Sequence, residues 1–147
     1  MITSFHTPET EFLSNFYLCC VPYEGFIYPS AENAYQAAKT LNIKARSAFT
    51  LEEMTPAMAK HLGKIIKIRS DWDQEKLQVM WDILSSKFED HDLKRLLLAT
   101  GDQELVEGNN WGDVYWGVCK GKGENNLGRL LMNLRKKLND EQFTNNL

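Results

Sequence analysis

Several patterns that would commit a chain to a particular chemistry are missing from these 147 residues. The three cysteines include the adjacent pair Cys19 and Cys20, and no CxxC or Cys/His ligand spacing occurs, which argues against a disulfide framework or a structural zinc site. No apolar run approaches the roughly 20 residues that cross a bilayer, and the N-terminus lacks the basic and apolar regions of a signal peptide. We therefore expect a reduced, soluble, cytoplasmic protein.

The sequence also lacks an excess of basic residues. Lys and Arg number 17 against 20 Asp and Glu, giving a formal net charge of −3. A protein that coats nucleic acid gains its affinity mainly by neutralising phosphates, so this class is disfavoured. The segments KHLGKIIKIR (60–69) and RKK (135–137) remain, either as solvated helix faces or as a local basic wall in which Lys60, Lys64 and Lys67 contact a few phosphates.

The apolar periodicity predicts a helix-rich α+β fold with a small sheet, in one domain spanning residues 1–147. Two short aromatic and apolar segments, 15–21 and 25–29, enclose the turn PYEG and predict a hairpin, after which Ser30 is expected to cap a helix. Other expected helices cover 55–63, 73–88 and 92–99, with short strands at 104–107 and 114–118. The helix at 73–88 carries residues at helical spacing that are expected in the core: Leu77, Met80, Trp81, Leu84 and Phe88. A leucine stripe predicts the last helix: Leu127, Leu130, Leu131, Leu134 and Leu138.

The stretch YPSAENAYQAAK (28–39) carries one glutamate and one lysine. In a helix, Glu32, Gln36 and Lys39 would fall within about 60° of one another on one face. Glu32 and Lys39 would nevertheless lie roughly 10 Å apart along the axis, too far for a helical ion pair. Either Glu32 suits the helix dipole and Lys39 extends to solvent, or both belong to a functional site.

The segment EGNNWGDVYWG (107–117) compresses two carboxylates, two tryptophans and three glycines into eleven residues. Glycines allow a ligand to approach the backbone, indoles stack on bases, and a carboxylate stabilises a developing cation, so the segment suggests a nucleotide pocket. Two simpler roles stay open: Trp116 as a core residue and Asp113 as a turn cap. GENNLG (123–128) is either a helix cap or a phosphate contact, and it is no P-loop.

In this order and at these spacings, LSNFY, YPSAENAYQAAK, KF (87–88), LLLATGDQELVEGNNWGDVYWG and NNLGRLLMNLR resemble the NADAR family. The resemblance covers about residues 5–138. This family includes N-glycosidases that act on riboflavin-biosynthesis intermediates and hydrolases that remove ADP-ribose from nucleobases. The resemblance implies a compact, helix-rich α+β fold and cleavage of the bond between a ribose C1 and an amine or base nitrogen, without metal or redox cofactor.

The resemblance also implies the positions of the site. One of two carboxylates, Glu32 or Asp113, would stabilise the sugar cation or activate water, and Lys39 would bind phosphate, protonate the leaving nitrogen or form a Schiff base. Substrate-binding roles fall on Asn15, Phe16, Gln36, Trp111, Trp116, Gly117, Asn126 and Gly128. At Asn33 the chain departs from the glutamate-histidine of the riboflavin branch, and its EGNNWGD loop is more similar to the branch that handles ADP-ribose.

These observations predict an N-glycosidase acting on an ADP-ribosylated nucleobase of the guanine type, or on a related ribosylamine phosphate. The ADP-ribosyl group would be free or attached to DNA or RNA, and no membrane is involved. An alternative is a module that binds ADP-ribose without cleaving it; only the enzyme needs Glu32, Asp113 and Lys39. A purely structural protein would leave the 107–117 segment unexplained. The leaving group and the oligomeric state stay open.

Overall fold

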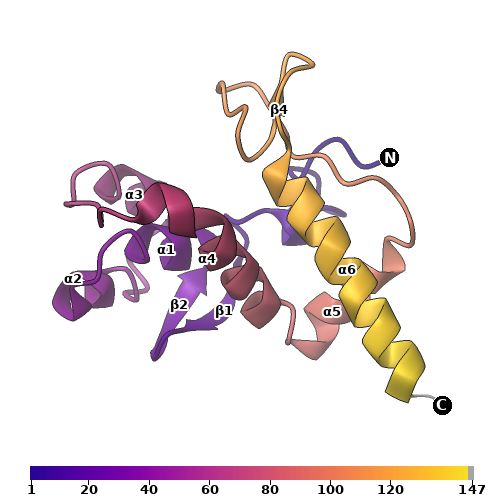
Figure 1. The fold of residues 1–147 in the computed structure, drawn as a ribbon, viewed down its shortest axis with the longest axis horizontal. Coiled ribbons are helices and arrows are strands. Elements are labelled where there is room, and N and C mark those ends of the chain that lie inside the picture. The colour runs from indigo at the N-terminus through magenta and orange to yellow at the C-terminus, as the bar shows by residue number, and fades with distance from the viewer. Residues whose placement is uncertain (146–147) are drawn as a thin grey trace. The chain divides into compact units, whose positions relative to one another are not determined.

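The computed structural model describes residues 1–145, which form two compact units. Unit 1 comprises Met1–Ser14 together with the chain from Asp90 onward, and unit 2 comprises Asn15–Glu89 (Figure 1). The single domain expected from the sequence therefore stays a prediction. Across the described residues, no helix is both long enough and apolar enough to cross a membrane.

Unit 2 opens with the predicted hairpin. Strands β1 (Leu18–Tyr23) and β2 (Phe26–Ser30) pair antiparallel around the two residues Glu24 and Gly25. Both turn residues have positive φ, 44° and 88°, as the two-residue turns that match strand twist require. The hairpin is confirmed, but β1 begins at residue 18 and not 15, and its turn is shorter than the expected PYEG because the strand continues through Tyr23.

Helix α1 (Ala31–Ala37) follows β2 without a loop. The Ser30 side chain accepts the Asn33 N–H at 3.0 Å, so the predicted cap is confirmed. The fully buried Asn33 amide donates in turn to the carbonyls of Phe49 and Met54, at 3.0 and 2.8 Å. The Asn33 side chain therefore links the start of α1 to the segment around residues 49–54 through two hydrogen bonds.

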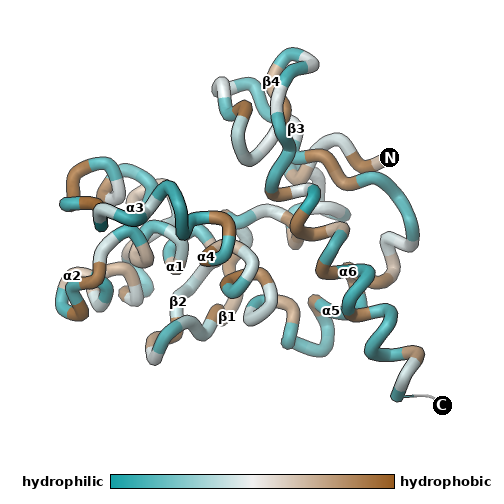
Figure 2. Tube along the Cα trace, viewed as in Figure 1, coloured by the Kyte–Doolittle hydropathy of each residue, from teal (hydrophilic) through white to brown (hydrophobic). Residues whose placement is uncertain are grey.

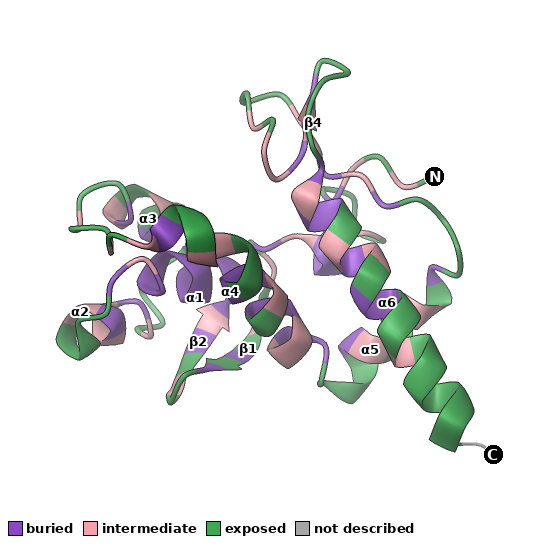
Figure 3. Ribbon diagram, viewed as in Figure 1, coloured by how far each residue is buried: buried purple, intermediate pink, exposed green. Residues whose placement is uncertain are grey.

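Three more helices complete unit 2: α2 (Ile43–Ala48), α3 (Pro56–Leu62) and α4 (Trp72–Lys87). Helices α3 and α4 pack against α1, and α4 also contacts β1. Every residue of α1 is buried (Figure 3), and its three alanines, Ala31, Ala34 and Ala37, are fully buried, as is the C-cap Ala38. Small side chains permit this close approach on all sides. The cap Thr55 and the start of α3 match the prediction, whereas α2 was not expected.

Helix α4 turns a slightly different face to the core than its periodicity predicts. Met80, Leu84 and the C-cap Phe88 are buried as expected, but Leu77 is 43% exposed. Lys87, a residue for which burial was not predicted, is fully buried. The expectation for Leu77 was wrong because the buried face is shifted toward Val79 and Ile83.

Unit 1 contains the short 3-10 helix η1 (Glu11–Leu13), α5 (His91–Ala99) and α6 (Asn126–Asn145). Helix α5 contacts both η1 and α6. Leu127, Leu131 and Leu134 form the buried stripe of α6, while its second half is hydrophilic (Figure 2) and largely exposed (Figure 3). Both helices were predicted from their leucine spacing.

The predicted strands of unit 1 were wrong in extent. The structure instead pairs β3 (Gly108–Asn109) in parallel with β4 (Val118–Cys119). Within 104–107, Leu105 makes only an isolated parallel bridge to Ile2, and residues 115–117 form a bend. The N-terminal residues supply the partner for 104–107, a pairing that sequence spacing did not reveal. The helix-rich α+β class itself is confirmed.

Candidate functional site

The centre of the candidate site in unit 2 is the buried carboxylate of Glu32. This residue lies in the first turn of α1 and is 8% exposed. Its backbone N–H donates to the Asn15 carbonyl at 2.9 Å, and its Oε1 accepts a hydrogen bond from Gln36 Nε2 at 2.7 Å. A buried carboxylate is costly unless it is hydrogen-bonded, and Gln36 meets part of that need. The structure thus brings Asn15, Glu32 and Gln36 together, and their roles in a site stay predictions.

Two amide oxygens lie buried in the same unit without a hydrogen-bond partner among residues 1–145: Asn15 Oδ1 and Gln36 Oε1. The other end of the Asn15 amide donates to Met80 Sδ at 3.6 Å. An unsatisfied buried acceptor costs about 1–3 kcal/mol, which a hydroxyl donor from a ligand would offset. Close to Glu32, such acceptors suit the hydroxyl groups of a sugar.

Gln36 can adopt its position because Gly63, the C-cap of α3, has no side chain. A methyl group on Gly63 would collide with Gln36 Oε1. The amide therefore lies between the Glu32 carboxylate and the backbone of α3. This contact makes Gly63 part of the support for the site, a role that nothing in the sequence indicated.

Lys39 lies outside the helix that carries Glu32. Helix α1 ends at Ala37, and Lys39 is in the following turn, with its N–H donating to Gln36 O at 3.2 Å. The expected continuous helix through residue 39 was wrong, because the chain tightens into this turn. Burial lowers the pKa of the Lys39 amine; the Glu32 charge opposes this shift, and Lys64, Lys60 and Lys76 add to it. The result is an amine that loses its proton more readily than an exposed lysine.

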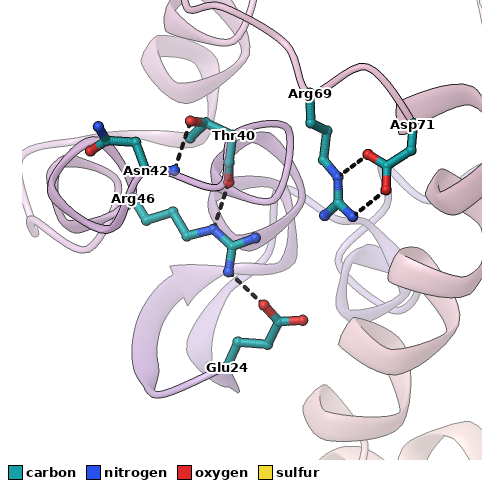
Figure 4. A network of polar contacts seen from close by, with 6 residues as sticks. All are labelled: Glu24, Thr40, Asn42, Arg46, Arg69 and Asp71. Carbon is teal, nitrogen blue, oxygen red and sulfur yellow. Dashed lines mark hydrogen bonds and ion pairs between the residues drawn. The ribbon is translucent and has the colours of Figure 1, made fainter.

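A buried arginine holds the turn after Lys39 (Figure 4). Arg46 is 3% exposed; its Nε donates to Thr40 O at 2.8 Å and its Nη1 lies 2.6 Å from Glu24 Oε2. The Lys39 carbonyl accepts the Arg69 N–H at 2.7 Å. The Arg69 side chain is itself fixed on Asp71, at 2.6 and 2.9 Å. Backbone on both sides of Lys39 is therefore anchored.

In unit 1, Asp113 organises the bend that follows it. Its Oδ1 accepts the N–H groups of Tyr115 and Trp116, at 3.1 and 2.9 Å. This geometry supports the turn-cap interpretation of Asp113. Its role as a catalytic carboxylate stays a prediction.

Trp111 offers an indole that a ligand can reach. It is 50% exposed, and the ring of His6 meets it edge-on with centroids 5.3 Å apart. Both residues line a broad hollow of about 500 Å³ within unit 1. Trp116 instead meets the ring of Tyr115 edge-on at 4.8 Å and is only partly exposed. In unit 2, Phe16 is 42% exposed. Exposed aromatic faces of this kind can stack on bases.

The remaining predicted positions have clear packing roles. A methyl on Gly117 would collide with Glu107, and one on Gly128 would collide with the Leu105 carbonyl. Asn126 donates to Tyr115 O through both its side chain, at 2.9 Å, and its backbone N–H, at 3.1 Å. Because these donors already serve the preceding bend, the cap interpretation of GENNLG is favoured over a phosphate contact. Substrate contacts by these three residues stay predictions.

Comparison with known proteins decides the family. The NADAR domain matches residues 4–139. The chain belongs to the NADAR family. It is 37% identical to N-glycosidase YbiA of Escherichia coli K12 over 143 residues, covering 93% of this chain and 88% of that protein. It is also 37% identical to N-glycosidase Npun_R5314 of Nostoc punctiforme, covering 76% and 74%, respectively.

Two further similarities extend this result. A riboflavin biosynthesis protein of Vibrio vulnificus, VVA0006, is 36% identical over 92% of this NADAR chain, which spans 38% of that longer protein. The NMR structure of E. coli YbiA superposes with a TM-score of 0.85 at 36% identity, covering 97% of this chain and 88% of that one. Fold and relatives agree, and this NADAR protein is an N-glycosyl hydrolase.

Sequence reasoning missed several residues that support the candidate side chains within each unit. Gly63, Arg46 and the buried Glu107 act through contacts between distant segments, and each sits in an ordinary local sequence. A small residue at the end of a helix, or an arginine within one, is too common to stand out. Glu107 was counted among the carboxylates of its segment, but its 8% exposure follows only from the fold.

Proposed function

We propose that this N-glycosidase hydrolyses the bond between ribose C1 and the base nitrogen of an ADP-ribosylated, guanine-type nucleobase. The observation that carries the proposal is the buried Glu32 carboxylate, held by Gln36 and adjoined by Asn15, whose amide oxygen is buried without a partner among the described residues. A ribosyl C–N bond breaks with positive charge developing on the sugar. A fixed carboxylate in a site of low dielectric stabilises that charge or activates water.

Lys39 would act on the same substrate. Its lowered pKa favours proton transfer to the leaving nitrogen, or attack by the neutral amine on C1 of the opened sugar. In the second case the base nitrogen leaves C1 with a proton as the Schiff base forms, and water then hydrolyses the Schiff base to release the sugar and the free amine. Lys60, Lys64 and Lys76 are close enough to influence its titration, so positive charge gathers near it. Such a group of cations favours a diphosphate. Asp113 is the alternative catalytic carboxylate, and Trp111 the proposed stacking platform.

A ribosylamine phosphate of the riboflavin pathway is the second candidate substrate, favoured by the similarity to VVA0006. It shares the scissile ribosyl C–N bond and a phosphate, but it lacks the adenosine half. The cytoplasm is the proposed location for either reaction. The negative net charge suggests that any DNA or RNA carrying the ADP-ribosyl group contributes only a few phosphate contacts.

Mass spectrometry of products from a substrate panel would test the proposal. The panel contains ADP-ribosylated guanine in DNA, the same in RNA, NAD and a pyrimidine ribosylamine phosphate. We expect free ADP-ribose and restored guanine from one or both nucleic acids, with much slower turnover of the other compounds. Tight binding of ADP-ribose without any product would favour the non-catalytic module. Product from the ribosylamine phosphate alone would favour the second candidate.

Two variants separate the proposed roles. Glu32→Gln should keep the shape of the site and much of the ligand affinity while losing turnover, because an amide supplies no full negative charge. If that variant turns over substrate within about threefold of the parent, Asp113 becomes the carboxylate to test. Lys39→Arg keeps a positive charge for phosphate but cannot form a Schiff base, so borohydride trapping of a protein–sugar adduct should be lost.

A further inference from the structure

The loop that carries Trp111 begins and ends on one asparagine. Asn109, in β3, accepts the Asp113 N–H on its Oδ1 at 3.0 Å and donates from its Nδ2 to Asp113 O at 2.8 Å. Both backbone groups of Asp113 are therefore bound by one side-chain amide. Only residues 110–112 lie between the two ends, with Gly112 at a positive φ of 86°.

A buried carboxylate fixes the orientation of this amide. Asn109 Nδ2 also donates to Glu107 Oε2 at 3.1 Å, and Glu107 is 8% exposed. If the amide were reversed, its oxygen would face two acceptors, Glu107 Oε2 and Asp113 O, while its NH₂ group would face the Asp113 N–H. A carboxylate can only accept when ionised, so Glu107 permits a single orientation of the amide.

The backbone of Glu107 is itself held by two hydrogen bonds, one to a side chain and one to another backbone group. Its N–H donates to Asn125 Oδ1 at 3.0 Å, and its carbonyl accepts the Val118 N–H at 2.8 Å. The absence of a side chain at Gly117 lets the carboxylate lie against the backbone there, since a methyl would collide with Glu107 Oε2. The Glu107 carboxylate is thus fixed in place. It binds the Asn109 amide, which in turn binds the Asp113 backbone at the end of the loop.

We propose that Asn109, oriented by Glu107, is a positioning residue that sets the place of Trp111 and of the Asp113 carboxylate in the N-glycosidase reaction. The Asp113 backbone is fixed by Asn109, while its side chain binds the next turn of backbone at Tyr115 and Trp116. Loss of the Asn109 amide would free both Trp111, in the middle of the loop, and Asp113, at its end. The kinetic part of this inference rests on the proposed function; the structural part does not.

The test compares Asn109→Asp with Asn110→Asp. The first replaces the donating NH₂ by an acceptor that faces Glu107 Oε2 and the Asp113 carbonyl. The second makes the same change of charge on the adjoining residue, which is exposed. Hydrogen exchange followed by NMR reports on the loop directly. In Asn109→Asp, protection of the Asp113, Tyr115 and Trp116 N–H groups should fall at least tenfold, with protection in α6 unchanged. In Asn110→Asp, all should stay within twofold of the parent.

Kinetics then measure the consequence for the reaction. On the substrate that the parent cleaves, Asn109→Asp should lower kcat/KM at least tenfold, and Asn139→Asp, which makes the same change of charge at an exposed position of α6, less than twofold. If hydrogen exchange of the Asp113 N–H in Asn109→Asp equals that of the parent, Asn109 does not hold the Asp113 backbone, and the proposal is overturned. Lost protection with kcat/KM within threefold would overturn the positioning role. If the parent cleaves nothing in the panel, the proposed function fails. Hydrogen exchange still shows whether Asn109 holds the Asp113 backbone.

Glu107→Gln provides a milder variant should Asn109→Asp fail to fold. It preserves size, but its amide can present either an oxygen or an NH₂ group to Asn109, so the orientation of Asn109 is then held by Asp113 alone. Protection of the Asp113 N–H should fall at least threefold, again with α6 unaffected. Protection equal to that of the parent would overturn the orienting role of Glu107.

Discussion

Gly63→Ala should damage the reaction while sparing the fold. Gly63 has φ −61°, a conformation that alanine adopts readily, and in an ordinary helical position the change would stabilise by about 0.4–1 kcal/mol. Here the added methyl collides with Gln36 Oε1, the end of a flexible side chain. The side chain can move away, but it then leaves its 2.7 Å hydrogen bond to Glu32, and this loss opposes the gain in stability from alanine.

The magnitude follows from that hydrogen bond. A hydrogen bond to a charged group contributes about 1.5–3 kcal/mol. If the whole contribution is expressed in the transition state, its loss slows kcat/KM by roughly 10- to 150-fold, since about 1.4 kcal/mol corresponds to a factor of ten. The thermal midpoint should shift by only a few degrees. His61→Ala, at an exposed position of the same helix, should change neither quantity.

A double-mutant cycle gives the sharpest assay. Gln36→Met removes the hydrogen bond by itself, so adding Gly63→Ala to that background should cost little further activity. Steady-state kinetics on the identified substrate and thermal melts would be measured for all four proteins. Additive losses, or a Gly63→Ala enzyme within twofold of the parent, would refute the idea that Gly63 acts by allowing Gln36 its place.

Three other perturbations test separate parts of the structure. Burial lowers the pKa of Lys87 from 10.5 to about 8, so the unfolded chain binds more protons between these values and stability should rise with pH across that window. Lys87→Met should raise the free energy of unfolding at pH 7 by up to about 3 kcal/mol and remove the rise; denaturant titrations showing a less stable variant would contradict this. The hydrogen bond from Arg46 holds the pKa of Glu24 below 4.5. The ionised Glu24 side chain therefore stabilises the fold above that pH, and this stabilisation is lost on acidification. Thermal melts from pH 3 to 6 should show that Glu24→Gln lacks this acid-dependent loss of stability. Trp111→Ala should weaken ligand binding by roughly 1–3 kcal/mol with folding intact, and calorimetry showing unchanged affinity would remove Trp111 from the site.

Local signals in the sequence were sufficient for the elements that rest on local physics. Ser30 and Thr55 cap helices through hydrogen bonds that span three residues, and the leucine stripe of α6 requires only its own periodicity. The hairpin follows from Glu24-Gly25 between two apolar segments. These features were predicted because every partner lies within one turn or one strand pair.

Contacts between distant segments explain what could not be predicted. The bridge between Leu105 and Ile2 joins residues about a hundred positions apart. The sequence therefore predicted a strand at 104–107 but did not indicate that its partner is the N-terminus. Lys87 appeared as an ordinary charged end of a helix, although the fold buries it completely. For the candidate site, Glu32 and Gln36 followed from helical spacing, whereas the position of Lys39 depended on where α1 ends.

The occupied side chain of Asn33 has a consequence for the evolution and engineering of this fold. Its amide donates to the carbonyls of Phe49 and Met54, so the conformation of 49–54 depends on the residue at position 33. A side chain here that cannot donate to both carbonyls leaves them without these hydrogen bonds, so the loop then needs other donors. Chimeras that exchange segment 49–54 between branches should therefore also exchange residue 33, although 16 residues separate Asn33 from Phe49 and 21 separate it from Met54.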